Sequence, residues 1–269
     1  MSVAPKLTCT KLEISGRVAT FTLNRPEALN ALSWDMREDF KALVAFLDGN
    51  EAIGALVLAG EGRAFCAGGD VTTMTSRLDD GPGQSRQRIL DVHQWLLRLH
   101  NIDCPVIAAV DGLAFGGGFS LALAADLVFA SEKAKFCAVF ARIGLMPDMG
   151  LAYTLPRLVG PQMAKDLMFT GRSIDVTEAK ALGLVHSVYP AGEVLAAAQA
   201  YAARLVEGLQ RAVRSRHLIG MAQGMIMQRY GVDMARAFAV LQRWSSHRNL
   251  PLREVAEAIV EGREPLPEP

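Results

Sequence analysis

Short, wholly apolar segments constrain the fold of this chain most. Three of them lie in its first half, at residues 55–59, 105–110 and 127–130. Strands without an alternating polar face are typical of a sheet covered on both sides. Before the first of these segments, Met36, Phe40 and Leu43 recur at helical spacing after Ser33, a favourable N-cap. The alternation of strands and helices predicts an α/β fold.

The two ends of the chain differ in pattern. Towards the N-terminus, residues 18–23 are predicted to form a strand. A helix is predicted before residue 105, with Ile89, Val92, Leu96 and Leu99 buried on one face. The polar stretch 71–84 is predicted to be a mobile loop. Beyond Pro190 no strand pattern remains. We therefore expect a core over residues 1–190 and a helical region over residues 191–269.

Composition excludes several classes of function. The 269 residues carry 28 basic and 28 acidic side chains, so there is no general attraction to nucleic acid or to an anionic membrane. The four cysteines are widely spaced within apolar stretches, which favours reduced thiols over disulfides or metal ligands. Neither a signal peptide nor a membrane-spanning stretch is apparent. We expect a cytoplasmic protein without a bound metal.

Two glycine-rich turns are the strongest candidates for chemistry. Gly116–Gly118 directly follow an apolar strand and precede a helix, so a ligand could approach main-chain N–H groups at a helix N-terminus. Residues 67–70, Ala-Gly-Gly-Asp, also follow an apolar strand. Each turn alone is compatible with tight packing. Two such turns at neighbouring strand ends could direct two N–H groups at one carbonyl oxygen.

Together these motifs resemble the crotonase superfamily, also called the enoyl-CoA hydratase/isomerase superfamily. The resemblance runs from about Val18 to Val188. Its elements are Asn24-Arg25-Pro26, Ala28-Leu29-Asn30, Phe65 to Asp70, residues 105–110, Gly116–Gly118, Ala125-Asp126, Phe136, Ile143-Gly144-Leu145, Leu155-Pro156-Arg157 and Ala181 to Val185. The C-terminal region departs most from the pattern, chiefly over residues 247–251.

The resemblance implies a fold, a ligand and a site. The fold would be a spiral of ββα repeats with a helical C-terminal region for trimerisation, the trimers often pairing into hexamers. The substrate would be an acyl-CoA thioester, as in fatty acid metabolism, with no cofactor beyond the CoA of the substrate itself. Ala67 and Gly117 would supply the oxyanion hole. The residues expected along CoA are Ala28, Leu29, Ala67, Asp70 and Val71.

The two glutamates of the hydratase pattern are missing. Ser120 and Phe140 occupy their places, and neither can act as a general acid or base. Asp148 remains, among apolar neighbours that would raise its pKa. Isomerases acting on dienoyl-CoA, and on ring-epoxide and oxepin CoA thioesters in phenylacetate breakdown, carry an aspartate at this motif position. A single carboxylate can remove a proton at one carbon and return it at another.

Isomerisation of a double bond or ring, with Asp148 as the proton shuttle, is therefore the favoured interpretation. Three alternatives stay open. The first is hydration of an enoyl-CoA by an unconventional base. The second is a hydrolytic dehalogenase or thioesterase that uses Asp148 as nucleophile and His93 to activate water, as the resemblance to 4-chlorobenzoyl-CoA dehalogenase implies. The third is a non-catalytic scaffold that binds CoA or RNA.

Overall fold

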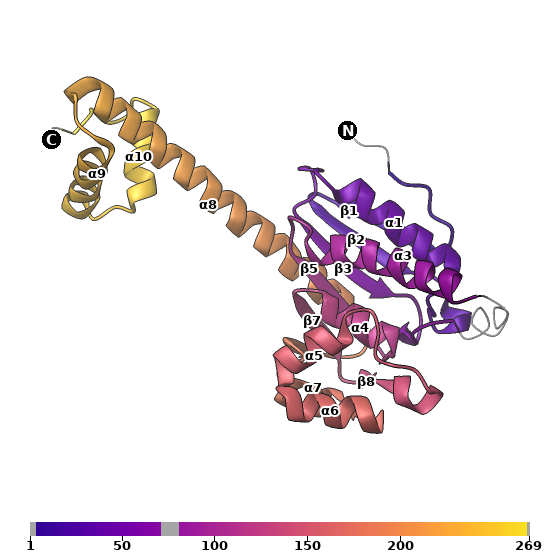
Figure 1. The fold of residues 1–269 in the computed structure, drawn as a ribbon. Helices are drawn as coiled ribbons and strands as arrows, with labels where there is room; N and C mark the ends of the chain where they lie inside the picture. The colour runs from indigo at the N-terminus through magenta and orange to yellow at the C-terminus, as the bar shows by residue number, and fades with distance from the viewer. Residues whose placement is uncertain (1–3, 71–80, 268–269) are drawn as a thin grey trace. The chain divides into compact units, whose positions relative to one another are not determined.

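The computed structural model describes residues 4–70 and 81–267 (Figure 1). It confirms an α/β fold with two sheets. The larger sheet has six strands in the order β1 (Thr10–Ser15), β2 (Val18–Leu23), β3 (Ala55–Gly60), β5 (Val106–Val110), β7 (Leu127–Ser131) and β10 (Ser187–Tyr189). Only β1 and β2 pair antiparallel, and the other neighbours are parallel.

The smaller sheet consists of four strands of three residues each. Its order is β4 (Ala64–Cys66), β6 (Leu113–Phe115), β8 (Lys135–Cys137) and β9 (Ser173–Asp175). The pairs β4–β6 and β6–β8 are parallel. Along the chain, β4, β6 and β8 each come directly after a strand of the larger sheet, namely β3, β5 and β7. This stepping between two sheets brings the ends of several strands to one place.

Helices complete the fold. The chain forms two compact units, residues 1–206 and 207–269. The first contains η1 (Pro26–Ala28), α1 (Trp34–Leu47), α3 (Pro82–His100), α4 (Gly117–Ala124), η2 (Val139–Ile143), α5 (Leu151–Val159), α6 (Pro161–Thr170) and α7 (Val176–Ala181). The long helix α8 (Val194–Tyr230) is followed by α9 (Met234–Arg248) and α10 (Leu252–Val260). As predicted, Ser33 caps α1: its hydroxyl accepts a hydrogen bond from the Met36 N–H at 3.2 Å.

The predicted burial of the larger sheet on both faces is confirmed. One set of side chains, including Leu56 and Leu58, packs with residues of α1 and α3 such as Phe40 and Leu99. The opposite set packs with the first turns of α8; its members are Val18, Ala55, Val57, Ala59, Ile107, Ala109, Phe129, Val194, Ala198, Ala202 and Val206. Strands of this sheet are apolar throughout because both of their faces are covered.

The boundary predicted at residue 190 is wrong. The compact units divide at 206/207, within α8. The cause is the packing of Val194, Ala198 and Ala202 into the core of the larger sheet. The second unit, residues 207–269, has its own core, in which Ile226, Leu241 and Ile259 from α8, α9 and α10 meet.

Three smaller predictions can also be compared with the structure. Val92, Leu96 and Leu99 of α3 are buried, but Ile89 is 54% exposed and does not belong to that face. The predicted loop over residues 71–84 lies largely outside the described residues, which resume at Gly81 with α3 beginning at Pro82. All four cysteines are free. No helix in the described parts is long and apolar enough to cross a membrane.

Candidate active site

The two glycine-rich turns lie against each other. A Cβ placed on Gly68 would stand 3.2 Å from the Gly117 nitrogen and 2.8 Å from the Phe115 carbonyl oxygen. Gly68 has φ +101°, a conformation that favours glycine. A Cβ on Gly118 would stand 2.0 Å from the carbonyl oxygen of Cys66. The backbones of β4 and α4 thus approach more closely than any side chain would allow.

The prediction that the Ala67 N–H points at the thioester is wrong. This group donates to the carbonyl oxygen of Leu29 at 3.0 Å, and an N–H already paired within the protein is not available to a ligand. The hydrogen bond fixes the turn after η1 to the end of β4. Ala67 still lines the cavity, but through other atoms.

Gly69 is the better candidate for the donor from this turn. Leu32 pairs with it in an isolated parallel bridge. In that bridge the Leu32 N–H donates to the Gly68 carbonyl at 2.8 Å, and the Asp70 N–H donates to the Leu32 carbonyl at 3.4 Å. Successive peptide groups of an extended segment point to opposite sides. The Gly69 N–H therefore faces away from Leu32, and Gly69 lines the cavity.

Gly117 is the predicted donor from the second turn, and this role stays a prediction. It is the first residue of α4, where N–H groups have no partner within the helix. The preceding Gly116 N–H donates to the Cys137 carbonyl at 2.8 Å, which holds this helix end on β8. Among the described residues no acceptor is found for the N–H of Gly69 or of Gly117. Both residues line the same cavity.

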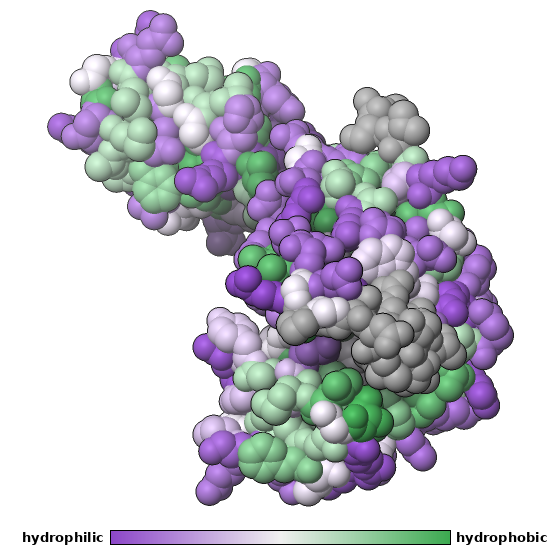
Figure 2. Space-filling model, turned by 45° about the vertical axis from the view of Figure 1, so that its right-hand side comes forward, coloured by the Kyte–Doolittle hydropathy of each residue, from purple (hydrophilic) through white to green (hydrophobic). Residues whose placement is uncertain are grey.

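The cavity has a volume of about 510 Å³, within the usual range for small-molecule sites. Its described lining is Leu32, Arg37, Ala67, Gly68, Gly69, Arg88, Ile89, Val92, His93, Gly116, Gly117, Val139, Phe140, Ile143, Leu145, Asp148 and Met149. The lining thus brings together α1, both glycine-rich turns, α3, η2 and the loop before α5. Figure 2 shows apolar surface gathered in the lower part of the first unit. Ile143 and Leu145 of the cavity lining and the neighbouring Met146 are exposed.

Asp148 is the one carboxylate among the described residues of this lining. Asp148 is an exposed residue, yet the protein atoms packed around its carboxyl group raise the pKa of that group above the ordinary range. The positive charges of Arg37 and His93 oppose that rise. The structure therefore brings together the predicted residues Asp148, His93 and Gly117. A carboxyl group with a raised pKa is suited to accepting and returning a proton near neutral pH.

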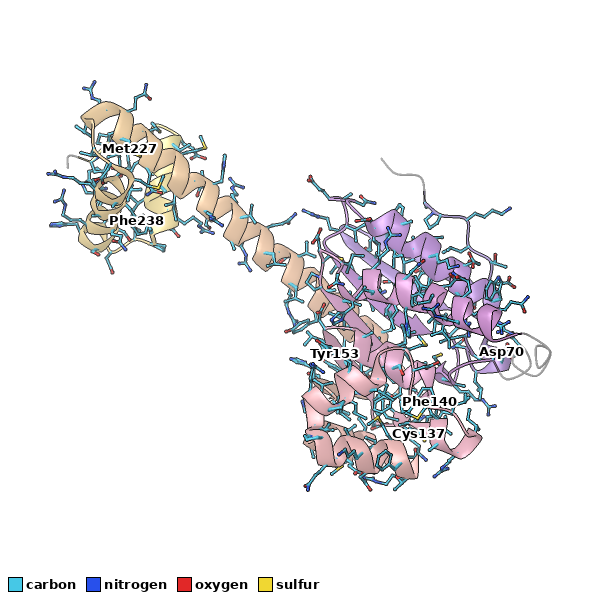
Figure 3. The ribbon with its side chains drawn as sticks, viewed as in Figure 1. Asp70, Cys137, Phe140, Tyr153, Met227 and Phe238 are labelled. Carbon is cyan, nitrogen blue, oxygen red and sulfur yellow. The ribbon has the colours of Figure 1, made fainter. Side chains whose placement is uncertain are left out.

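The positions of the two missing glutamates have distinct roles. Ser120 is buried, and its hydroxyl lies within hydrogen-bonding distance of the main-chain carbonyl oxygens of Asp148 (3.1 Å) and Gly116 (3.3 Å). Phe140, labelled in Figure 3, lines the cavity, and a Cβ on Gly116 would stand 4.0 Å from its ring carbon Cζ. Met149, next to Asp148, has φ +49° and is buried. A Cβ on Gly117 would stand 2.9 Å from the Met149 sulfur, so the Asp148 loop adjoins the α4 end.

The residues predicted to lie along CoA are placed as follows. Ala28 and Leu29 form the end of η1, beside Ala67. The Asp70 carboxylate is buried and pairs with the Arg25 guanidinium at 3.0 Å, which stabilises the turn after Gly69. Asp70, labelled in Figure 3, is the last described residue before residues 71–80. Val71 lies outside the described residues. Contacts of these residues with CoA stay a prediction.

Two lining residues had no signal in the sequence. Arg37 is the fourth residue of α1, and Arg88 belongs to the first half of α3. Both helices were predicted. The direction of these two side chains toward the cavity depends on packing between segments far apart in the sequence, which local patterns do not show. Gly69 had a signal, since it belongs to the turn already singled out. Trp95 of α3 does not line the cavity: it is buried in the core and stacks on Phe40 at 4.5 Å.

Comparison with known proteins identifies the family. The model of the family described as enoyl-CoA hydratase/isomerase matches residues 13–228. A probable enoyl-CoA hydratase of Rhizobium meliloti is 42% identical over 177 residues, covering 66% of this chain and 67% of the relative. The short-chain-enoyl-CoA hydratase of Clostridium acetobutylicum is 35% identical over 204 residues, covering 76% and 77%.

A solved structure is similar along almost the whole chain. The enoyl-CoA hydratase/isomerase of Cupriavidus metallidurans superposes with a TM-score of 0.72 at 32% identity, covering 95% of this chain and 89% of that one. A second family model, the ANTAR domain, matches residues 207–260. That match covers most of the second unit, including the region that departs from the crotonase pattern. By its family match, its relatives and its fold, the chain is a member of the enoyl-CoA hydratase/isomerase family, within the crotonase superfamily.

Proposed function

We propose that this protein is an acyl-CoA isomerase that moves a double bond, or opens or rearranges a ring, with Asp148 as its single proton shuttle. The observation that carries the proposal is the composition of the cavity. Asp148 is the one carboxylate among its described residues, and the same cavity is lined by Gly69 and Gly117, whose N–H groups have no acceptor among the described residues. The places of the two hydratase glutamates hold Ser120 and Phe140.

The chemistry would run in two proton transfers. The N–H groups of Gly69 and Gly117 would hold the thioester oxygen, and negative charge would develop there as the Asp148 carboxylate takes a proton from the adjacent carbon. Asp148, now protonated, would return that proton to a carbon further along the acyl chain. Proton and electron pair both stay within the complex, so the product has the mass of the substrate. No metal or redox cofactor is required by these steps.

The site favours proton transfer within the substrate over addition of water. Hydration needs a base for water and a proton donor for the other carbon. Asp148 could serve as one of these groups, and no second carboxylate lines the described part of the cavity. The names of the relatives support enoyl-CoA hydration as the second candidate. Hydrolysis through Asp148 and His93 is a third, because both side chains line one cavity.

The product of each reaction has its own mass. We would incubate the protein with 3-enoyl-CoA and, separately, with 2-enoyl-CoA, and follow mass and double-bond position by mass spectrometry and NMR. Isomerisation leaves the mass unchanged and shifts the double bond. Asp148→Asn should lower this rate by about a hundredfold or more, in line with general acid–base catalysis. Asp48→Asn is the matched control, because Asp48 is exposed and pairs with Arg98 outside this cavity.

Two results would overturn the proposal. A product heavier by one water, formed equally well by Asp148→Asn, would assign hydration by a base other than Asp148. Release of free CoA, lost in both Asp148→Asn and His93→Gln, would assign hydrolysis.

A further inference from the structure

The loop that carries Asp148 contains a non-glycine residue in the left-handed region of backbone conformation. Met149 has φ +49°, and Gly150 after it has φ +80°. The Cβ atom makes this conformation costly for any residue other than glycine, least so for asparagine and aspartate. Such residues persist where the surrounding structure holds them, and they gather at active sites. The contacts of Met149 must therefore compensate for the cost of its backbone conformation.

The Met149 side chain packs against the second glycine-rich turn. Met149 is 5% exposed, and it lines the cavity together with Asp148. A Cβ on Gly117 would stand 2.9 Å from the Met149 sulfur and 3.3 Å from Cδ1 of Leu32. The thioether thus occupies the space beside Gly117 that a larger residue would need. It connects the loop of the carboxylate with the helix end that is the predicted oxyanion donor.

Hydrogen bonds hold the main chain on the other side of this residue. The Asp148 carbonyl oxygen accepts from the Leu151 N–H at 3.0 Å and from the Ser120 hydroxyl at 3.1 Å. Leu151 is fully buried and begins α5. These hydrogen bonds fix the peptide group between Asp148 and Met149. The packed thioether adds an independent constraint, because it fixes the side chain that follows this peptide group.

On the proposed function, we infer that Met149 is a positioning residue for Asp148. Its buried side chain, packed against Gly117, keeps the loop in a conformation that costs free energy, and so fixes the carboxylate in the cavity that Gly117 also lines. Met149 exchanges no proton, since a thioether does not titrate. It determines the distance and direction between the base and the oxyanion donors. Small displacements of a catalytic group lower rates steeply.

Three substitutions separate the effect of the side chain from that of the backbone. Met149→Leu keeps both the side-chain volume and the costly backbone. Met149→Ala removes most of the side chain and keeps the backbone cost, and Met149→Gly removes both. Met36→Ala is the matched control, because Met36 is fully buried in α1 and does not line this cavity. Each variant of the full chain would be studied by isomerisation kinetics, thermal melting and carbon-13 NMR titration of the aspartate carboxyl groups.

The expected kinetic effect is on kcat. Met149→Ala and Met149→Gly should lower kcat by about tenfold to a hundredfold and change KM by less than about threefold. Met149→Leu should keep at least about a third of kcat. Met36→Ala should lower Tm by about 5–10 °C, as Met149→Ala does, and leave kcat unchanged. Met149→Gly should melt no lower than Met149→Ala, although glycine is destabilising relative to alanine where φ is negative.

The NMR titration tests the inference without relying on turnover. The signal of Asp148 is assigned from its loss in Asp148→Asn. Protein atoms packed around this carboxyl group raise its pKa. In Met149→Ala and Met149→Gly the released carboxyl group should meet more water, so its pKa should move down toward the ordinary value. In Met149→Leu and Met36→Ala the pKa of Asp148 should stay where it is in the unchanged protein.

Other outcomes would overturn the inference. A kcat of Met149→Ala equal to that of the unchanged protein would do so. A rise of KM alone would assign Met149 to the wall that binds the acyl group. If the unchanged protein isomerises neither enoyl-CoA, the proposed function fails and the titration decides on Met149. A lower Asp148 pKa in Met149→Ala but not in Met149→Leu then supports the positioning role, and an unchanged pKa in Met149→Ala excludes it.

Discussion

The hydroxyl of Ser120 lies 3.1 Å from the main-chain carbonyl oxygen of Asp148 and donates to it. Ser120 stands where the hydratase pattern has a glutamate, and Asp148 is the carboxylate that remains at the cavity. The residue at the vacated position thus contributes to fixing the loop that carries the remaining acid. This relationship makes the position of the carboxylate testable without removing it.

Ser120→Ala should slow the reaction while the protein stays folded. Loss of one buried hydrogen bond should lower the free energy of unfolding by about 1 kcal/mol, and release of the Asp148 loop should lower kcat about tenfold, because small misplacements of a catalytic group are costly. Urea unfolding and steady-state kinetics measure the two effects. Ser131→Ala is the control: Ser131 is as deeply buried, and its hydroxyl has no partner in the described part of the chain. Equal kcat losses in both variants would contradict the role of Ser120.

The pH dependence of the reaction should follow Asp148. The carboxylate must be deprotonated to accept a proton, so kcat/KM should rise with pH and level off above the pKa of Asp148, which burial raises. Arg37 holds that pKa down by its charge. Arg37→Gln should therefore move the acid limb to higher pH, and Arg37→Lys should restore it. An acid limb that stays in place in Arg37→Gln would exclude Asp148 as the titrating base.

Stability should depend on the same carboxyl group. Its pKa in the folded protein lies above its ordinary value, so the folded state holds the proton more tightly than the unfolded one. The resulting stabilisation is present at low pH and is lost as pH rises through this pKa. Asp148→Asn should abolish this loss, giving a higher Tm than the unchanged protein at pH 8 and a smaller difference at pH 4. Thermal melts at both values measure it, and a Tm that falls in Asp148→Asn at pH 8 would refute it.

Asn30 should be essential for the fold around the site. Its side chain is fully buried, donates to the carbonyl oxygens of Glu61 (2.9 Å) and Ala64 (2.7 Å), and accepts from the Arg25 N–H at 2.8 Å. Asn30→Ala removes the partner of three main-chain groups, the buried carbonyl of Ala64 among them, and should cost roughly 2–4 kcal/mol of unfolding free energy. Asn101→Ala is the control, because Asn101 is exposed and bonds only within its own helix end. Similar losses in the two variants, measured in urea, would contradict this role.

Two glycines in helices should respond in opposite ways to alanine. Gly118→Ala sets a Cβ 2.0 Å from the Cys66 carbonyl oxygen, where only backbone could move away, so the variant should be insoluble or lose more than about 4 kcal/mol. Gly220 lies in α8 with no described atom within 4 Å of such a Cβ. Gly220→Ala should stabilise the protein by about 0.5–1 kcal/mol. Thermal melting compares the two, and a folded, fully active Gly118→Ala would show that β4 and α4 are not in close contact.

The larger sheet and its helices could be predicted because their signals are local. The apolar residues 55–59 indicate a strand covered on both faces without reference to any other segment of the chain. Ser33 indicates the start of α1 by its residue type alone. The smaller sheet was missed because strands of three residues are too short to show a period. The boundary between the units was misplaced because α8 is helical on both sides of it, and only packing divides it.

The site shows the same limit. Asp148, His93 and Gly117 could be predicted as residue types at motif positions. The direction of the N–H groups of residues 67–69 could not be predicted. It depends on the pairing of Leu32 with Gly69 and on the hydrogen bond from the Ala67 N–H to the Leu29 carbonyl oxygen. The sequence does not distinguish Arg37 from the other arginines, because Arg37 reaches the cavity only through the packing of α1 beside α3. Sequence patterns thus identify the chemical groups, and long-range pairing decides the direction in which each one points.

Main-chain donors have a consequence for how this cavity can be mapped. An alanine scan reports on Asp148, Arg37 or Ser120 through the side chain that it removes, but it leaves every peptide N–H in place. The contributions of Gly69 and Gly117 would pass unseen in such a scan, however large they are. Semisynthesis that replaces the Gly116–Gly117 amide by an ester deletes one N–H and adds no side chain. This ester substitution tests the main-chain donor itself, which a side-chain substitution cannot do.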